Sequence, residues 1–374
     1  MLHKSILILS LAVTGMLYAS PILQMNRAFM ALTDLIPFIT ERDKFMDKKN
    51  SALIETKMTE LQSAFKDAKH DPLMKEDLFA PSYALINENL TTSRAAFKAG
   101  NKDYAQWRLK EITSHCLDCH TRLPPSYTSS FQDGGLTIDA KKFDNTYNLG
   151  LAQLIVRRYP DATASFTRDI DEKLIKNEIK NLQSPFKQLL LIETKVMKNP
   201  KNIQSILMSY KEKKNLPEEL RNDMISWLGQ LKRWQDRPIL EKGLQTDKEV
   251  QDFITKELQP LKKNESANND VDLLFASGLF SNYLFLNPTS KKAPEITYWL
   301  GWAEKRLKKE NFFGSGDLFL KQCIRRFPAH AVARDCLDEY RESVEFDFSG
   351  SSGTHIPQDV KKELDGLEKL IKKK

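Results

Sequence analysis

The residues best suited to chemistry lie together in one short segment, Cys116-Leu117-Asp118-Cys119-His120, which has the form C-x-x-C-H. Two cysteines three positions apart lie on one turn of a helix, so both thiols can add to the vinyl groups of one haem. The histidine that follows is then aimed at the iron as an axial ligand. The motif therefore predicts one covalently attached haem c, with Cys116 and Cys119 as thioether residues and His120 as the proximal iron ligand.

Two other chemistries use closely spaced cysteines, and both fit this segment less well. A closed zinc site needs four ligands, and no second C-x-x-C or H-x-x-H half is present. A thioredoxin-like C-x-x-C follows a strand, whereas the pattern here places the motif at the end of a helix. Surface or capping roles are expected for the remaining histidines of the mature chain, His70, His115, His330 and His355.

The N-terminus has the order of a secretory signal peptide. Lys4 precedes an apolar run over 6–18, and Ala19 and Ser20 supply small residues before Pro21. At roughly 14 apolar positions the run is shorter than the ~20 residues of a membrane span. We therefore predict cleavage after Ala19 and export to a bacterial periplasm, with no transmembrane segment afterwards; an uncleaved anchor is the alternative. Haem c is attached outside the bacterial cytoplasm, so export and the haem motif support each other.

The composition indicates a helical protein of about two domains. The chain has 374 residues, 41% of them hydrophobic, with only 14 Gly and 16 Pro, which favours long helices over a turn-rich β architecture. Solvated lysines account for the net charge of +7, and no aromatic-basic motif of a nucleic-acid binder occurs. We therefore expect no nucleic-acid partner.

Apolar residues recur at helical spacing in four segments before Pro125. The helices are expected at about 22–39, 52–69, 75–99 and from 102 into the C-x-x-C-H motif. Their short connections predict an up-down-up-down bundle over residues 20–125, and cofactors in such bundles lie between facing helices.

This part of the chain resembles a known family. The segment 99–104 (AGNKDY), followed by a helix that ends in C-x-x-C-H, is similar to the last helix of the cytochrome c-prime family and its low-spin relatives. The resemblance covers the first third of the chain and implies a four-helix bundle with the haem at the end of helix four. In the low-spin members a methionine of helix one is the second axial ligand, whereas high-spin members leave the iron open.

Helix one offers two candidates for that ligand. Met25 lies near the centre of the apolar stripe, and Met30 lies about 140° away at ~100° per residue. Met25 is therefore the preferred distal ligand and Met30 the alternative, while an open or histidine-ligated iron is not excluded. The family usually has an arginine near this point, and Arg27 could contact a haem propionate, although its spacing to either methionine departs from the family pattern.

The two other cysteines, Cys323 and Cys336, lie thirteen positions apart. Pro328 between them is expected to separate two helices. In an oxidising compartment a disulfide across this hairpin is the preferred interpretation, and two buried unpaired thiols are the alternative.

Beyond a polar, Gly-containing linker predicted at 126–142, helical patterns resume. The form Y-x-L-G-x-A occurs at 147–152 and 298–303. From the second copy onward, the sequence resembles a degenerate tetratricopeptide (TPR) unit, with five matching residues: Leu300, Gly301, Gly316, Leu320 and Pro328. Residues 143–347 are therefore expected to form a TPR-like helical array with a concave binding surface, or an irregular helical domain that only supports the bundle. A flexible break and a last amphipathic helix are expected at 348–374.

Together these patterns favour an exported monohaem electron carrier or electron-transfer subunit, and not an enzyme. Its C-terminal helices would dock a redox partner protein, and self-association stays open. A gas-binding or sensing haem protein with an open distal site is one alternative. A TPR-like assembly or scaffold protein is the other.

Overall fold

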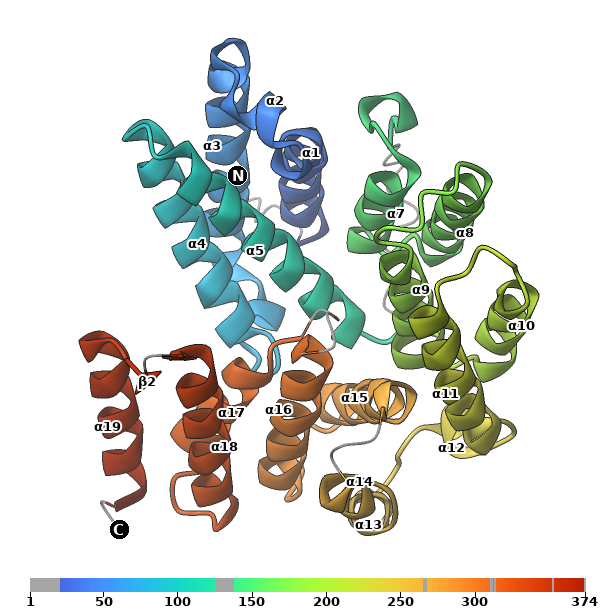
Figure 1. The fold of residues 1–374 in the computed structure, drawn as a ribbon. Helices are drawn as coiled ribbons and strands as arrows, with labels where there is room; N and C mark the ends of the chain where they lie inside the picture. Colours follow the sequence, from blue (N-terminus) through green and yellow to red (C-terminus); the bar gives the residue numbers. More distant parts are fainter. Residues whose placement is uncertain are drawn as a thin grey trace, which may run out of the picture.

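Helices make up nearly all of the chain, so the prediction of an all-α protein is confirmed. The computed structural model, drawn in Figure 1, describes residues 21–125, 138–264, 268–309, 312, 314–351 and 353–372, with the side chains of 21–24 and 372 excepted. The predicted signal peptide (1–19) and residues 126–137 of the predicted linker lie outside this description. Among the described residues, no helix is both long and apolar enough to cross a membrane.

Four long helices form the first part of the structure: α1 (Pro21–Thr40), α3 (Ser51–Asp67), α4 (Ala80–Lys98) and α5 (Lys102–Arg122). α1 packs mainly on α3, α3 on α4, and α4 on α5. The connections hold four short elements: α2 (Arg42–Met46) and the 3₁₀ turns η1 (Lys48–Asn50), η2 (Ala68–His70) and η3 (Pro72–Lys75).

The sequence predicts the third helix from about residue 75, but α4 begins at Ala80. The intervening residues form η3, whose start is capped by the Asp71 side chain accepting from the Leu73 amide. At the other end of α4, Gly100 adopts φ = 82°, a left-handed conformation that stops the helix at little cost for glycine. Asn101 then caps α5 by accepting a hydrogen bond from the Tyr104 amide.

The second part is an array of helices in which consecutive members pack on each other. It begins with η5 (Ala140–Lys142), and two of its segments, η6 and η7, are π-helical. The elements are α7 (Thr146–Ile155), α8 (Tyr159–Ile175), α9 (Gln183–Leu190), η6 (Leu191–Val196), α10 (Pro200–Lys211), α11 (Glu218–Trp234), α12 (Ile239–Lys242), α13 (Asp247–Phe253), η7 (Ile254–Leu258), α14 (Gln259–Lys263), α15 (Asp270–Leu286), α16 (Ala293–Lys309), α17 (Gly316–Arg326) and α18 (Val332–Asp347).

The two copies of Y-x-L-G-x-A have the same packing role. A Cβ atom added at Gly150 of α7 would lie 2.7 Å from the Phe166 ring of α8, and one added at Gly301 of α16 would lie 2.7 Å from Leu320 of α17. In each copy the glycine therefore lets the following helix approach closely.

Both ends of the array return to the N-terminal helices. α7 contacts α1 and α5, η6 and α15 contact α5, and α17 contacts α4, so the array curves round as Figure 1 shows. The buried apolar residues form one continuous cluster from Ala28 to Leu367. The linker predicted at 126–142 thus joins two stretches of sequence that share a core.

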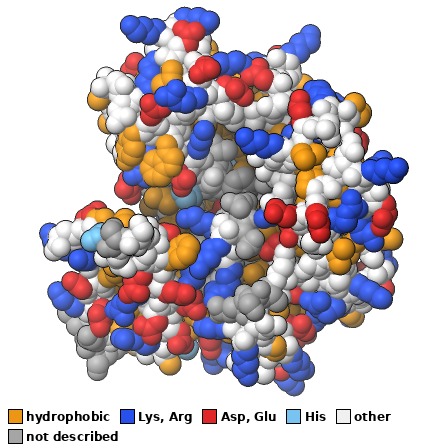
Figure 2. Space-filling view, in the orientation of Figure 1, with side chains coloured by type: hydrophobic (Ala, Val, Ile, Leu, Met, Phe, Trp, Pro, Cys, Tyr) orange, Lys and Arg blue, Asp and Glu red, His pale blue; other side chains and the backbone are white. Residues whose placement is uncertain are grey.

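The end of the chain is folded onto the array. A two-residue pairing of β1 (Ser349–Gly350) with β2 (Gly353–Thr354) occupies the predicted break. α19 (Gln358–Lys372) then packs on α17 and α18 and buries Leu364. On the face drawn in Figure 2, basic and acidic side chains are interspersed, which fits a solvated, mixed-charge surface.

Candidate functional site

An apolar cavity of about 280 Å³ lies between the N-terminal helices, and the C-x-x-C-H motif forms part of its wall. This volume is close to the lower end of the roughly 300–1,000 Å³ typical of small-molecule sites. The lining residues come from α1, α3, α4, α5, α7 and the 71–79 segment: Met25, Ala28, Phe29, Leu32, Leu61, Phe65, Asp71, Leu73, Met74, Phe79, Tyr83, Ile86, Cys116, Cys119, His120, Leu123 and Ile155.

The two motif cysteines share one face of α5 near its C-terminal end, as the i, i+3 spacing requires. Neither is in a disulfide. Burial raises the pKa of the Cys116 thiol to about 12 and that of the Cys119 thiol to about 11. Both thiols are therefore protonated at neutral pH.

His120 is oriented by a hydrogen bond from its own ring. Its Nδ1 contacts the backbone oxygen of Ile155 at the end of α7, and since a carbonyl can only accept, Nδ1 carries the proton. The other ring nitrogen, Nε2, then keeps its lone pair, and the ring lines the cavity. Burial, and secondarily the Arg157 charge, lower the pKa of His120 to about 4, so the imidazole is neutral at neutral pH.

Arg157, a residue that the sequence motifs do not single out, closes the end of α5. Its buried guanidinium donates to the backbone oxygens of His120 (3.1 Å), Leu123 (3.1 Å) and Pro124 (2.8 Å). Carbonyls at the end of a helix lack intrahelical partners, and a cation there is also favoured by the helix dipole. The backbone of Arg157 adopts φ = 63°, a conformation more usual for glycine or asparagine.

Two methionines line the cavity. Met25 on α1 is the predicted distal ligand, and it is half-buried there. Met74 is the second, and the sequence prediction missed it because it lies in the short turn η3 rather than in helix one. The cavity therefore has two thioether side chains that could face a metal bound by His120.

The structure does not bring the other two predicted residues of helix one to the cavity. Met30 is 45% exposed and lies beside Asn26, Arg27 and Glu60, on the face of α1 away from the motif. Five residues along a helix give a rotation of about 140° relative to Met25, which accounts for this placement. Arg27 forms an exposed ion pair with Asp67 of α3 at 3.0 Å and does not line the cavity, and its contact with a haem propionate stays a prediction.

The remaining histidines lie outside the cavity lining. His330 has the predicted capping role, because its Nδ1 accepts a hydrogen bond from the Val332 amide at 3.3 Å. His115 differs from the prediction of a surface position: it is half-buried, and burial lowers its pKa.

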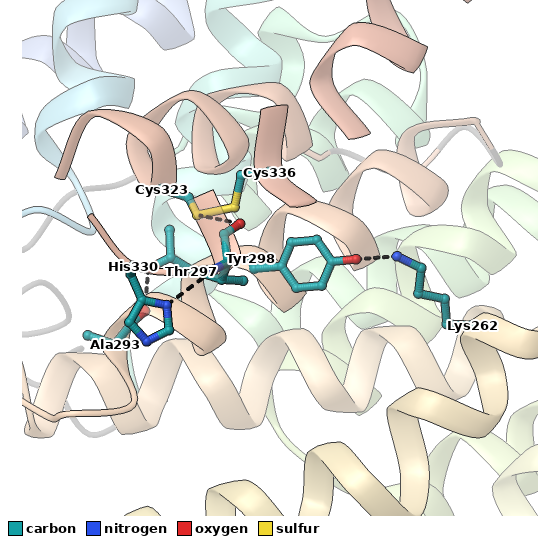
Figure 3. The surroundings of a disulfide bond; sticks show 8 residues. Lys262, Ala293, Thr297, Tyr298, Cys323, His330 and Cys336 are labelled. Carbon is teal, nitrogen blue, oxygen red and sulfur yellow. Dashed lines mark hydrogen bonds between the residues drawn. A yellow bond between two sulfur atoms is a disulfide. The ribbon is translucent and has the colours of Figure 1, made fainter. Parts of the chain in front are cut away.

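Cys323 and Cys336 form a disulfide between α17 and α18 (Figure 3). Both cysteines are fully buried, and neither lines the cavity. The bond ties together the last helices of the array and takes no part in the candidate site.

The candidate site thus combines two protonated thiols, a neutral imidazole with a fixed ring and two thioethers around one apolar cavity. Among the described residues, no group of three or more His, Cys, Asp or Glu side chains is arranged to hold a metal ion by itself. No protein-family model matches the chain, and comparisons with curated proteins and with solved structures find no match either.

Proposed function

We propose that the protein is an exported monohaem c-type cytochrome whose role is single-electron transfer. The observation that carries the proposal is the Nδ1 hydrogen bond of His120 to Ile155, at a cavity that Cys116 and Cys119 also line. Iron-ligating histidines usually donate their other ring nitrogen to a carbonyl or carboxylate, which fixes the ring and its tautomer. The shared cavity and the fixed ring of His120 therefore support a haem c site at the three residues that the motif predicts.

The lining of the rest of the cavity also supports the proposal. Its walls are mostly apolar and come from three helices facing the motif. Cys116 and Cys119 would hold the group covalently, and His120 would bind its iron. When bound, the haem supplies reversible one-electron exchange at iron, with a potential set by axial ligands and burial. The apolar walls would keep water away from it, and Arg157 would hold the helix end that carries His120.

In this proposal α1, α3, α4 and α5 are the haem-bearing four-helix bundle that the resemblance to the cytochrome c-prime family implies. Met25 or Met74 is the second axial ligand. The array from α7 to α18 is the TPR-like docking domain for a redox partner in the periplasm, and self-association is open to test. We propose a carrier or electron-transfer subunit rather than an enzyme.

The absorption spectrum of the reduced protein, expressed with haem-attachment machinery, tests this proposal. We expect a six-coordinate, low-spin spectrum without added ligand. Either Met25→Ala or Met74→Ala should convert it to a high-spin spectrum, because the iron loses one ligand. Met30→Ala is the matched control and should leave the spectrum unchanged, since Met30 lies away from the cavity.

Two outcomes would contradict the proposal. A five-coordinate spectrum in the unsubstituted protein, with ready binding of carbon monoxide or nitric oxide, would favour the gas-binding alternative. Absence of any haem spectrum would favour the scaffold alternative, in which the helical array is the functional part.

A further inference from the structure

A chain of four buried charges connects the motif-bearing helix to the array. Asp118 of α5 forms ion pairs with Arg122 and, at 3.7 Å, with Lys195 of η6. Lys195 in turn pairs with Glu304 of α16 at 2.7 Å. The four side chains are between 0% and 2% exposed. Since a buried charge is tolerated only when it is paired, these four groups hold one another in place.

Further contacts determine where each charge lies. Arg122 donates to the Leu78 backbone oxygen (2.9 Å) and to Ser82 Oγ (3.0 Å). The hydroxyl of Ser315, just before α17, donates to Asp118, and that of Ser277 of α15 donates to Glu304. Four elements of the array, η6, α15, α16 and the start of α17, thus contribute to one polar network around Asp118.

Lys195 is itself placed by close backbone packing. It lies in the π-helical segment η6, a type of distortion that is frequent at functional sites. A Cβ atom at Gly278 of α15 would overlap the backbone oxygen of Lys195, so only glycine allows α15 to lie so close. The array therefore presents the Lys195 ammonium to Asp118 from a fixed position.

The network reaches the C-x-x-C-H motif through Asp118. Asp118 lies between Cys116 and Cys119, two residues before His120, yet its side chain is not part of the cavity lining. Burying an ionic network carries a desolvation penalty, and apolar side chains of similar volume would often stabilise the core equally well. The charges around Asp118 are explained if they orient the turn that bears the motif.

We propose that Lys195 is a positioning residue for the Cys116–His120 turn, acting through Asp118, and that its charge also acts on the redox couple of a haem attached there. The second part rests on the proposed function. Oxidised iron carries one more positive charge than reduced iron, so a nearby fixed cation favours the reduced form and raises the midpoint potential, and an anion lowers it.

Three substitutions in the full-length, haem-loaded protein test the redox part. Lys195→Met should lower the midpoint potential and Asp118→Asn should raise it, because they remove charges of opposite sign. Lys305→Met is the matched control: Lys305 is also buried, at 4% exposed, but pairs with Glu339 of α18 at 2.7 Å, and should leave the potential unchanged. General loosening of the site would shift the first two variants in the same direction, and that result would overturn the redox part.

Amide hydrogen exchange of the full chain tests the positioning part without relying on haem. Lys195→Met should accelerate exchange over residues 115–123, whereas Lys195→Arg, which keeps the charge, and Lys305→Met should not. Equal exchange in Lys195→Met and the unsubstituted chain would overturn the proposal. If Lys195→Met does not fold, Lys195→Met/Glu304→Gln removes a cation and an anion together, and the same acceleration of exchange over residues 115–123 is expected for it. If the unsubstituted protein fails to take up haem, that result contradicts the proposed function and not the positioning role of Lys195. The hydrogen-exchange comparison would still test the positioning role.

Discussion

At the residue scale, Arg157 stabilises the candidate site from outside the motif. It is 1% exposed and supplies hydrogen bonds to three carbonyls at the end of α5. Its φ of 63° is unfavourable for a residue with a Cβ atom. A strained backbone at a buried side chain that makes three hydrogen bonds indicates that the side chain is needed there.

Replacing Arg157 should therefore destabilise the protein. Arg157→Ala is expected to lower the free energy of unfolding by about 2–4 kcal/mol, because buried carbonyls lose charge-assisted hydrogen bonds. Arg157→Gly should cost less, since glycine adopts φ = 63° without strain. Urea unfolding measures both. The neighbouring Arg158→Ala is the control and should cost less than ~1 kcal/mol, because Arg158 is 41% exposed and pairs with Asp161; equal losses at 157 and 158 would contradict the capping role.

Glu339 gives the stability of the array a dependence on pH. Burial alone would raise its pKa, but hydrogen bonds and charge from Lys305 and Lys262 outweigh burial and hold the pKa below the ordinary value of 4.5. Its contribution to stability is therefore complete above pH 4.5 and is lost as the pH falls through the lower folded pKa.

Glu339→Gln should remove this part of the pH dependence. The urea midpoint of the unsubstituted protein should fall more steeply below pH 4.5 than that of the variant, because only the unsubstituted protein must protonate the buried carboxylate. Glu345→Gln, an exposed glutamate of the same helix, should leave the profile unchanged. Parallel profiles for Glu339→Gln and the unsubstituted protein would refute this assignment.

Some of the site residues could be predicted from the sequence and others could not. Cys116, Cys119 and His120 could be predicted because they form a short local pattern, C-x-x-C-H, that is visible without any knowledge of the fold. Met74 and Arg157 reach the site only because η3 and the end of α7 pack beside it, and no local sequence pattern predicts that packing. Helical periodicity placed Met25 on the inward face of helix one and Met30 away from it, and of these two residues Met25 alone lines the cavity. The ion pair of Arg27 with Asp67 could not be predicted, because Asp67 comes from a different helix.

At the element scale, glycines determine how closely the helices of the array approach. Periodicity located α1, α3, α4 and α5, because each has an apolar face. It did not predict η3 ahead of α4, nor the π-helical turn η6, since both depend on contacts made by the folded chain. The close approach of α15 to η6 at Gly278 is the clearest case.

Gly278→Ala should therefore destabilise the protein despite the better helix propensity of alanine. The added methyl would meet the Lys195 backbone, which cannot move aside as a flexible side chain could. We expect a loss of about 1–3 kcal/mol, typical of an overpacked core. At Gly229, an exposed position of α11, the added methyl meets no atom within 4 Å, so Gly229→Ala should instead stabilise the protein by about 0.5–1 kcal/mol. Thermal unfolding would show the opposite signs, and a gain at both positions would rule out the close contact.

At the scale of the whole molecule, the array and the N-terminal helices build the candidate site together. Ile155 and Arg157 position His120 from the array side, and Lys195 reaches Asp118 from η6. The sequence predicted the order of the two parts and their helical class, but not this sharing. Long-range contacts between segments far apart in the chain leave no periodic signal, whereas the helices themselves do.

For the same reason, the sequence predicted only part of how the array packs. The two Y-x-L-G-x-A copies mark helices whose glycine faces the next helix, at Gly150 and Gly301. The helices between the two copies lack this sequence pattern, and two segments among them, η6 and η7, are π-helical rather than α-helical. The curvature that returns α17 to α4 follows from packing along the whole array.

The central claim is that Cys116 and Cys119 carry one haem. The most direct test is mass spectrometry of the tryptic peptide 111–122 from full-length protein made with haem-attachment machinery. We expect this peptide to carry the added mass of one haem, and Cys116→Ser/Cys119→Ser to abolish that mass. Recovery of the unsubstituted peptide without haem, with both cysteines open to alkylation after unfolding, would contradict the claim.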